Sequence, residues 1–310
     1  MILVLLLFPI LFFALTYGVY RFAFYTPNRT QNDDLAVAST PQMEARREKI
    51  RQLISEARKI PYERVSIHSH DGLHLAGRYY RGQAGAPLYL CFHGYRGTPC
   101  RDFSGGIQIM RRSGYHILLV EERGHCSSEG HVITFGIRER LDVLDWVQFA
   151  RERFGQETPI ILVGISMGAA TVLMASELAL PEQVKGIIAD CPYTSPREII
   201  RKVCTDMKIP GSAGLWLAQV AARLYGRFDL SAAASEEAVR HAQVPILLIH
   251  GEQDHFVPCE MSRRIKQTAP DKIDLHTFPG AGHGLSFLMD PERYEKIIRE
   301  FSEKVASQDA

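Results

Sequence analysis

The sequence predicts an α/β fold, in which helices cover both faces of a mostly parallel β-sheet of about eight strands. Five short apolar runs, rich in Ile, Leu and Val and bounded by turn residues, have the length of buried parallel strands. They read PLYLCFHG, YHILLVEERG, PIILVGISMG, VKGIIADCP and VPILLIHG. Helical patterns separate these runs, and the alternation is typical of βαβ units with right-handed crossovers.

The first element is an apolar segment at the N-terminus. No residue from Met1 to Tyr20 carries a charged side chain, and about 20 apolar residues can span a hydrocarbon core about 30 Å thick. We therefore expect a single-pass transmembrane anchor over residues 1–22. A cleaved signal peptide and a buried core helix are the alternatives, although no basic residue precedes Arg21, where a signal peptide would have its basic region.

Residues 23–64 are predicted to be a polar linker that contains one amphipathic helix between Pro41 and Lys59, because apolar residues recur there at helical spacing. Basic residues gather on this side of the apolar segment: Arg21, Arg29, Arg46, Arg47, Lys49, Arg51, Arg58 and Lys59. Since Lys and Arg near a membrane span favour the cytoplasm, the rest of the chain is predicted to be cytoplasmic.

Residues 65–310 are predicted to form one large domain. It begins with two alternating runs around Asp71-Gly72, a pattern typical of a β-hairpin. Helices are predicted over residues 137–151, 169–180, 260–268 and 291–305. Residues 193–240 contain a helical pattern from Leu215 to Leu224 but no strand-like run, so we expect an inserted helical cap there.

The composition excludes some classes of function. Hydrophobic residues make up 46% and charged residues 23% of the 310 residues, as in an ordinary globular protein. The net charge of +1 lacks the basic excess of a nucleic-acid binder, so no nucleic-acid partner is expected. The six cysteines show no zinc-site spacing, so no metal site is predicted. Cys91 and Cys191 adjoin apolar runs and are expected to be buried free thiols.

The segment Gly164–Gly168 carries the clearest chemical motif. Ligands of open α/β sheets bind beyond the carboxyl ends of the strands, and the sequence GISMG lies between a predicted strand and a predicted helix. This fits the G-x-S-x-G turn, which presents its serine as a nucleophile at a helix N-terminus. Ser166 is therefore the candidate nucleophile, and a serine that only caps the helix is the alternative.

A nucleophilic serine needs a base, and the base needs a carboxylate that orients it. His283 lies in a glycine-rich loop before the last predicted helix, and Asp254 follows the last strong strand run. The chain order of Ser166, Asp254 and His283 is the order found in α/β hydrolases. The alternative acids are Asp190 and Glu252, and the alternative bases are His125, His131, His250 and His255.

Two backbone N–H groups are expected to hold the oxyanion of the transition state. One is that of Met167, the residue after the candidate nucleophile. The other is that of Tyr95, in the loop HGYRG after the first of the five strand runs. An ordinary strand-ending turn at His93-Gly94 is the alternative reading of this loop.

Taken together, residues 65–305 resemble the α/β-hydrolase superfamily, in particular the bacterial serine aminopeptidase-type (S33-like) and cinnamoyl-esterase-type hydrolases. The matching stretches are DGLHLAG, FHGYRGTP, EERGHCSSEG, GISMG, ADCPYTS, HGEQDHFVP and GAGHG. One departure is Cys126, which stands where such sequences usually have glycine. The resemblance implies a cofactor-free hydrolase with Ser166 as nucleophile, His283 as base and Asp254 as its partner.

The expected reaction is hydrolysis of a small carboxylic ester through an acyl-enzyme. A peptidase, an acyltransferase and a thioesterase would use the same three residues, so these activities remain alternatives. A binding module without activity would be expected to lose one member of the triad, and all three are present. The oligomeric state is not predicted.

Overall fold

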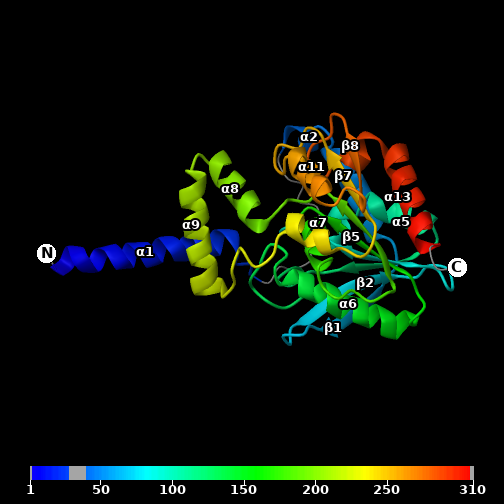
Figure 1. Ribbon diagram of the computed structural model, residues 1–310, viewed down its shortest axis with the longest axis horizontal. Helices are drawn as coiled ribbons and strands as arrows, with labels where there is room; N and C mark the ends of the chain where they lie inside the picture. Colours follow the sequence, from blue (N-terminus) through cyan, green and yellow to red (C-terminus); the bar gives the residue numbers. More distant parts are fainter. Residues whose placement is uncertain (1, 28–39, 308–310) are drawn as a thin grey trace.

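The computed structural model describes residues 2–27 and 40–307, with side chains placed from residue 8 onward. Its described residues form one eight-stranded sheet with the order β1-β2-β4-β3-β5-β6-β7-β8 (Figure 1). The strands are β1 (Glu63–His68), β2 (His74–Tyr80), β3 (Leu88–Phe92), β4 (His116–Val120), β5 (Ile160–Ile165), β6 (Val184–Asp190), β7 (Ile246–Gly251) and β8 (Ile273–Phe278). β2 is antiparallel to β1 and β4, and the pairs from β4 to β8 are parallel. The predicted fold class is confirmed.

The central strands are buried on both faces because their side chains alternate between two cores. In β3, Leu88, Leu90 and Phe92 join one hydrophobic cluster, whereas Tyr89 and Cys91 join the other. This is the two-residue period of a strand in a sheet that is covered on both sides.

Helices supply the opposite walls of these two cores. One face is covered by α6 (Glu139–Phe154), α7 (Met167–Ala175) and α11 (Cys259–Thr268). The other is covered by α3 (Arg47–Arg58), α5 (Gly106–Arg112) and α13 (Pro291–Ala306). Short helices complete the described elements: α2 (Pro41–Glu44), α4 (Pro99–Asp102), α10 (Ser235–Ala238), the 3₁₀ helix η3 (Val239–His241) and α12 (Ser286–Met289).

The amphipathic helix predicted between residues 41 and 59 is present as α2 and α3. Thr40 caps α2 by accepting from the backbone N–H of Met43, and Pro41 takes the first helical position, where its missing N–H costs nothing. The apolar face of α3 is buried, with Ile54 fully enclosed. The segment therefore packs on the large domain.

The inserted cap consists of helices, as predicted. It contains α8 (Pro196–Asp206), α9 (Gly211–Ala221) and the π-helical turn η2 (Ala222–Gly226). Leu215 on α9 is buried in a cluster with Met167 and Ala170, at the start of α7. The cap thus packs over the carboxyl end of β5.

The N-terminal helix α1 (Ile2–Ala23) extends away from the sheet, and α9 crosses it (Figure 1). The Phe12 ring lies 6.0 Å from the Trp216 ring of α9, and the Tyr225 hydroxyl donates to the carbonyl of Phe13 at 3.0 Å. Near the end of α1, the Tyr20 side chain is buried.

The predicted membrane anchor over residues 1–22 is not supported. Within the described part of the chain, no helix has the length and apolarity needed to cross a membrane. The described contacts of α1 are with the cap and with the loop after β3. Most of its large apolar side chains from Phe8 to Phe22 are exposed, so α1 is not the buried core helix of the alternative either. A membrane partner for this segment loses its support together with the anchor, and the cytoplasmic placement that rested on the anchor stays a prediction.

We predict that Gly168→Ala destabilises the fold. A Cβ at Gly168 would lie 2.0 Å from the carbonyl oxygen of Phe92 and 2.7 Å from that of His93. Because both obstacles are backbone atoms of the neighbouring β3 connection, the free energy of unfolding should fall by about 3 kcal/mol, near the upper end of overpacking costs. Thermal unfolding measures the effect.

Gly106→Ala is the matched control, because a Cβ at Gly106 would meet no atom closer than 3.9 Å and alanine favours the helix. Equal melting temperatures for the two variants would contradict the predicted clash.

Candidate active site

Ser166 sits on a sharp turn between β5 and α7. Its φ of 55° and ψ of −111° place it in a backbone region that residues other than glycine rarely adopt. The backbone N–H of Ser166 donates to the carbonyl of Asp190 on β6 at 2.8 Å. A Cβ at Gly164 would lie 2.3 Å from the carbonyl oxygen of Gly168, so the two flanking glycines allow the strand and the helix to approach. The turn exposes the Ser166 side chain at the carboxyl edge of the sheet.

Asp254 follows β7 and is held by its own loop. Its Oδ1 accepts from the backbone N–H groups of Phe256 and Val257 at 2.9 and 2.8 Å. These bonds leave Oδ2 to face His283, which lies in the loop between β8 and α12. The carboxylate is 4% exposed.

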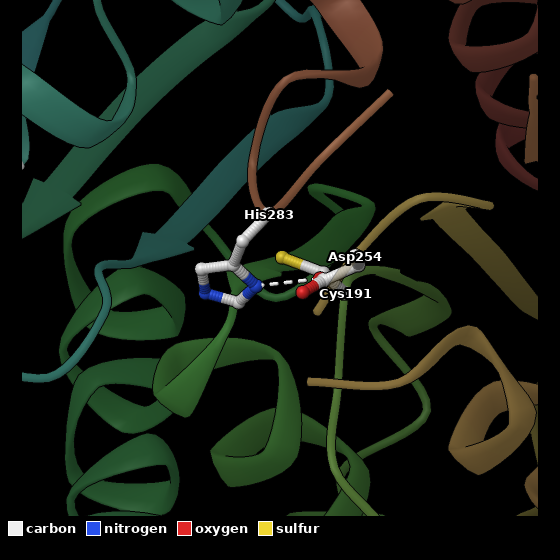
Figure 2. A group of neighbouring side chains, drawn as sticks. All are labelled: Cys191, Asp254 and His283. Carbon is white, nitrogen blue, oxygen red and sulfur yellow. Dashed lines mark hydrogen bonds and ion pairs between the residues drawn. The ribbon is translucent and has the colours of Figure 1, made fainter. Parts of the chain in front are cut away.

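The structure brings Ser166, His283 and Asp254 together as the sequence predicts. Asp254 Oδ2 lies 2.7 Å from His283 Nδ1, and His283 Nε2 lies 2.9 Å from Ser166 Oγ. Figure 2 shows the first of these contacts as a dashed line. Because Nδ1 faces a carboxylate, it carries the ring proton, and Nε2 is left to accept from the serine hydroxyl. This is the geometry of a Ser-His-Asp triad.

The surroundings of Asp254 keep its carboxylate ionised. Burial by itself opposes ionisation, but the nearby His250 and His283 outweigh it and hold the pKa of Asp254 well below its usual value. His250, an alternative base in the sequence, is fully buried and bonds to Ser262 Oγ at 2.7 Å and to the carbonyl of Val257 at 2.8 Å. His250 therefore supports the loop that carries Asp254, and neither of these bonds involves Ser166.

A thiol lies beside the acid and the base. Figure 2 shows Cys191, which follows β6, next to Asp254 and His283, and donor atoms of the three lie within 4.8 Å of one another. Such a trio has the residue types of a metal site. However, Asp254 and His283 are already bonded to each other, and burial raises the pKa of the Cys191 thiol well above its usual value. The thiol is thus kept protonated, which disfavours metal binding.

The loop after β3 packs against the serine. A Cβ on Gly94 would come within 3.4 Å of the Ser166 Cβ and within 3.1 Å of Asp102 Oδ2. Asp102 Oδ2 accepts from the Gly94 backbone N–H at 2.8 Å, which fixes the start of the loop. Tyr95 is the next residue and lines the same cavity as Ser166. Met167, the other expected donor, is the first residue of α7, where backbone N–H groups lack partners within the helix.

Two histidines at strand ends, His93 and the alternative base His125, support this loop. His93 Nε2 accepts from the Glu122 backbone N–H at 3.1 Å, and His125 Nε2 accepts from the Arg96 backbone N–H at 3.0 Å. Both rings are buried and meet edge to face at 4.8 Å. The sequence signal for this role is position. His93 and His125 each come directly after a predicted strand, in the stretches HG and RGH, and the two strands are neighbours in the sheet.

The end of α1 is also bonded to the loop. The Tyr95 hydroxyl donates to the carbonyl of Ala23 at 2.9 Å, and the Arg96 guanidinium donates to the carbonyls of Phe22 and Tyr25 at 2.6 and 3.3 Å. The Tyr95 ring stacks on Phe135 at 5.0 Å. The loop that carries the expected oxyanion donor is therefore held from the side of the N-terminal helix.

The backbone at Cys126 accounts for the glycine that similar sequences usually have there, and nothing in the structure explains the cysteine. Cys126 has a φ of 49°, in the left-handed region where glycine is favoured. Nearby, Arg123 binds Asp142 and Asp71 through its guanidinium, with Asp142 Oδ2 at 2.7 Å from Nε and Asp71 Oδ2 at 2.8 Å from Nη1. This buried ion-pair network fixes the segment in which the cysteine stands.

Asp190, the main alternative acid, lies beside the triad but bonds elsewhere. Its Oδ2 accepts from the Tyr294 hydroxyl of α13 at 2.9 Å. Burial raises the pKa of Asp190 to about 6, against the opposing effects of Tyr294 and the nearby histidines. Glu252, the other alternative, is exposed and accepts from the Thr277 hydroxyl.

A cavity of about 580 Å³ opens at Ser166 and His283, within the usual range of ligand pockets. Its walls are mostly apolar and come from β5, β6, α3, α5, α12 and α13: Val163, Ile188, Ile50, Leu53, Met110, Phe287, Leu288, Tyr294 and Ile298. None of the described lining residues belongs to the cap, so Leu215 and its neighbours pack on the domain. Another cavity, of about 740 Å³, lies at the starts of β7 and β8 and contains no triad residue.

Comparison with known proteins agrees with this architecture. The family described as alpha/beta hydrolase fold matches residues 87–226. The structure is similar to the esterase Pf2001 of Pyrococcus furiosus, with a TM-score of 0.65, 21% identity, and coverage of 91% of this chain and all of that chain. Together with the observed sheet, these similarities show that the chain has the α/β-hydrolase fold. Its subgroup among the α/β hydrolases stays a prediction.

Among curated relatives, the lysophosphatidylserine lipase ABHD12 of Danio rerio is 27% identical over 212 residues, which cover 66% of this chain and 52% of the relative. The uncharacterized protein YqkD of Bacillus subtilis is 22% identical over 189 residues, covering 61% and 62%. The chain thus spans about half to three fifths of the length of these relatives.

We predict a pH-dependent stability difference between the wild-type chain and Asp190→Asn. Because the pKa of about 6 in the folded chain lies above the usual value near 4, the folded chain binds more protons than the unfolded chain between these pH values. The contribution of this carboxyl to the free energy of unfolding therefore falls as the pH rises from about 4 to about 6. Above pH 6 the contribution does not return. Between pH 4.5 and pH 8, the free energy of unfolding of the variant should rise, relative to that of the wild type, by on the order of 1–3 kcal/mol.

Denaturant unfolding at the two pH values measures this double difference. Asp271→Asn removes an exposed carboxyl and serves as the control. Parallel pH profiles for wild type and Asp190→Asn would contradict the assigned effect of burial.

Proposed function

We propose that this protein is a serine hydrolase that cleaves carboxylic esters through an acyl-enzyme. One observation carries the proposal: the bonded chain from Asp254 through His283 to Ser166, with contacts of 2.7 and 2.9 Å. A serine that only caps a helix needs no imidazole on its hydroxyl, and a carboxylate behind that imidazole serves to orient and stabilise it.

In the first step, His283 Nε2 takes the proton of Ser166 Oγ as that oxygen attacks the ester carbonyl carbon. The carbonyl π electrons move to the oxygen, which becomes an oxyanion. The backbone N–H groups of Met167 and Tyr95 donate to it, and the ionised Asp254 stabilises the imidazolium. Asp254 stays a carboxylate throughout, consistent with its lowered pKa.

The tetrahedral intermediate then collapses. The bond from carbon to the alcohol oxygen breaks, and His283 gives its proton to that oxygen, so that a neutral alcohol leaves. Water next attacks the acyl-serine while His283 Nε2 takes a water proton. Collapse of the second intermediate releases the carboxylic acid and returns the proton to Ser166.

The cavity is the proposed acyl site. The alcohol departs first and needs an open path, whereas the acyl group stays attached to Ser166 until water arrives. A partly enclosed space beside Ser166, lined by side chains such as Ile188 and Leu288, suits the retained group. Its apolar walls favour a hydrocarbon acyl group through the hydrophobic effect. Similarity to a lysophosphatidylserine lipase is consistent with an ester of this kind.

We predict that Ser166→Ala lowers the kcat/KM for p-nitrophenyl butyrate by about four orders of magnitude or more, because the attacking oxygen is removed. Steady-state release of p-nitrophenol measures it. Ser176→Ala is the matched control, since Ser176 lies at the far end of the same helix and its hydroxyl only donates to the carbonyl of Leu173.

The control should keep nearly all activity. Hydrolysis by Ser166→Ala at the rate of the Ser176→Ala control would overturn the assignment of the nucleophile.

A further inference from the structure

The Asp190 side chain begins next to the nucleophile. In the pairing of β5 with β6, Asp190 is opposite Ile165, and its carbonyl accepts from the Ser166 backbone N–H at 2.8 Å. Ile188, two residues earlier on the same strand, lines the cavity, and so does Asp190. Residues two apart on a strand share a face. Asp190 therefore lies on the cavity wall, and its backbone adjoins the reacting serine.

One oxygen of this carboxyl has no partner. Oδ2 accepts from Tyr294, but Oδ1 is buried without a hydrogen bond to any described residue. Asp190 as a whole is 5% exposed. The other carboxylate among the described lining residues, Asp102, is satisfied on both oxygens by Arg101 Nε and the Gly94 backbone N–H. The unmet acceptor thus distinguishes Asp190 within the cavity.

An unsatisfied buried oxygen costs free energy, because it has lost water and gained no donor. Ile188, Val163 and Ile298 on the same wall are apolar and cannot supply one, and no polar lining residue that the structure describes bonds to Oδ1. The triad does not use this residue either, because Asp254 already occupies His283 Nδ1. A donor brought into the cavity by the substrate would satisfy Oδ1.

We propose that Asp190 is a specificity-determining residue whose Oδ1 accepts a hydrogen bond from a hydroxyl or amine on the acyl group of the substrate. The inference rests on the proposed function and narrows its substrate class to esters of short hydroxy- or amino-acids whose donor lies within the first few carbons from the scissile carbonyl. The proximity of Asp190 to Ser166 sets that position, and the apolar walls accept the remaining carbons.

The test compares matched esters that differ only in the donor. These are p-nitrophenyl butyrate, p-nitrophenyl 3-hydroxybutyrate and p-nitrophenyl 3-aminobutyrate. A hydrogen bond to a buried charged acceptor corresponds to about a tenfold to hundredfold preference. We expect the wild-type kcat/KM to favour at least one donor-bearing ester over butyrate by about tenfold or more, and the two arms tell a hydroxyl from an amine.

Asp190→Leu removes the acceptor while keeping the branching of the side chain at Cγ. This variant should lose the preference, so that the ratio of kcat/KM for donor-bearing ester to butyrate falls to about one or below. Butyrate turnover also reports that the variant is folded. Should Asp190→Leu fail to fold, Asp190→Asn keeps the shape and loses the charge, and its ratio should fall several-fold because neutral acceptors form weaker bonds.

The outcomes separate the inference from the proposed function. Wild-type hydrolysis of butyrate without any preference for the donor-bearing esters overturns the inference and leaves the serine hydrolase standing. A preference that persists unchanged in both Asp190 variants overturns it as well. A wild-type chain that cleaves none of the three esters overturns both proposals.

Discussion

The site depends on the backbone turn at Ser166. A positive φ at a serine is unfavourable, and the fold holds it through the hydrogen bond to Asp190 and through two glycines that let β5 and α7 meet. Everything else in the site is placed relative to this turn. Because of this turn, Oγ lies next to His283, and the first N–H groups of α7 are left for the substrate. Asp190 lies on the adjoining cavity wall.

Two different parts of the chain surround the site. On one side, the cap packs over the start of α7, and the end of α1 bonds to the loop of Tyr95 and Arg96. On the other, α3, α5, α12 and α13 enclose the cavity. The first group supports the backbone that is proposed to bind the oxyanion, and the second shapes the space for the acyl group. Specificity is thus expected from the cavity walls, since the described cap residues do not reach them.

The sheet and the triad could be predicted from the sequence because both depend on local patterns. These patterns are the apolar runs, the G-x-S-x-G turn, and the polar residues at strand ends. The sequence was insufficient for β8, whose stretch IDLHTF mixes polar and apolar residues because an edge strand is only partly buried. It could not tell how α1 packs, since an apolar face suits lipid and protein alike. The loop bonds of His93 and His125, and the unpartnered oxygen of Asp190, arise only from long-range packing.

The proposed mechanism requires Ser166 to be a nucleophile that His283 and Asp254 activate. Covalent labelling by a fluorophosphonate, followed by mass spectrometry of the labelled peptide, tests it most directly. We predict stoichiometric labelling at Ser166, at a rate that falls by orders of magnitude in His283→Ala, because the hydroxyl then lacks its base. Labelling at another residue, or an unchanged rate at Ser166 in His283→Ala, would contradict it.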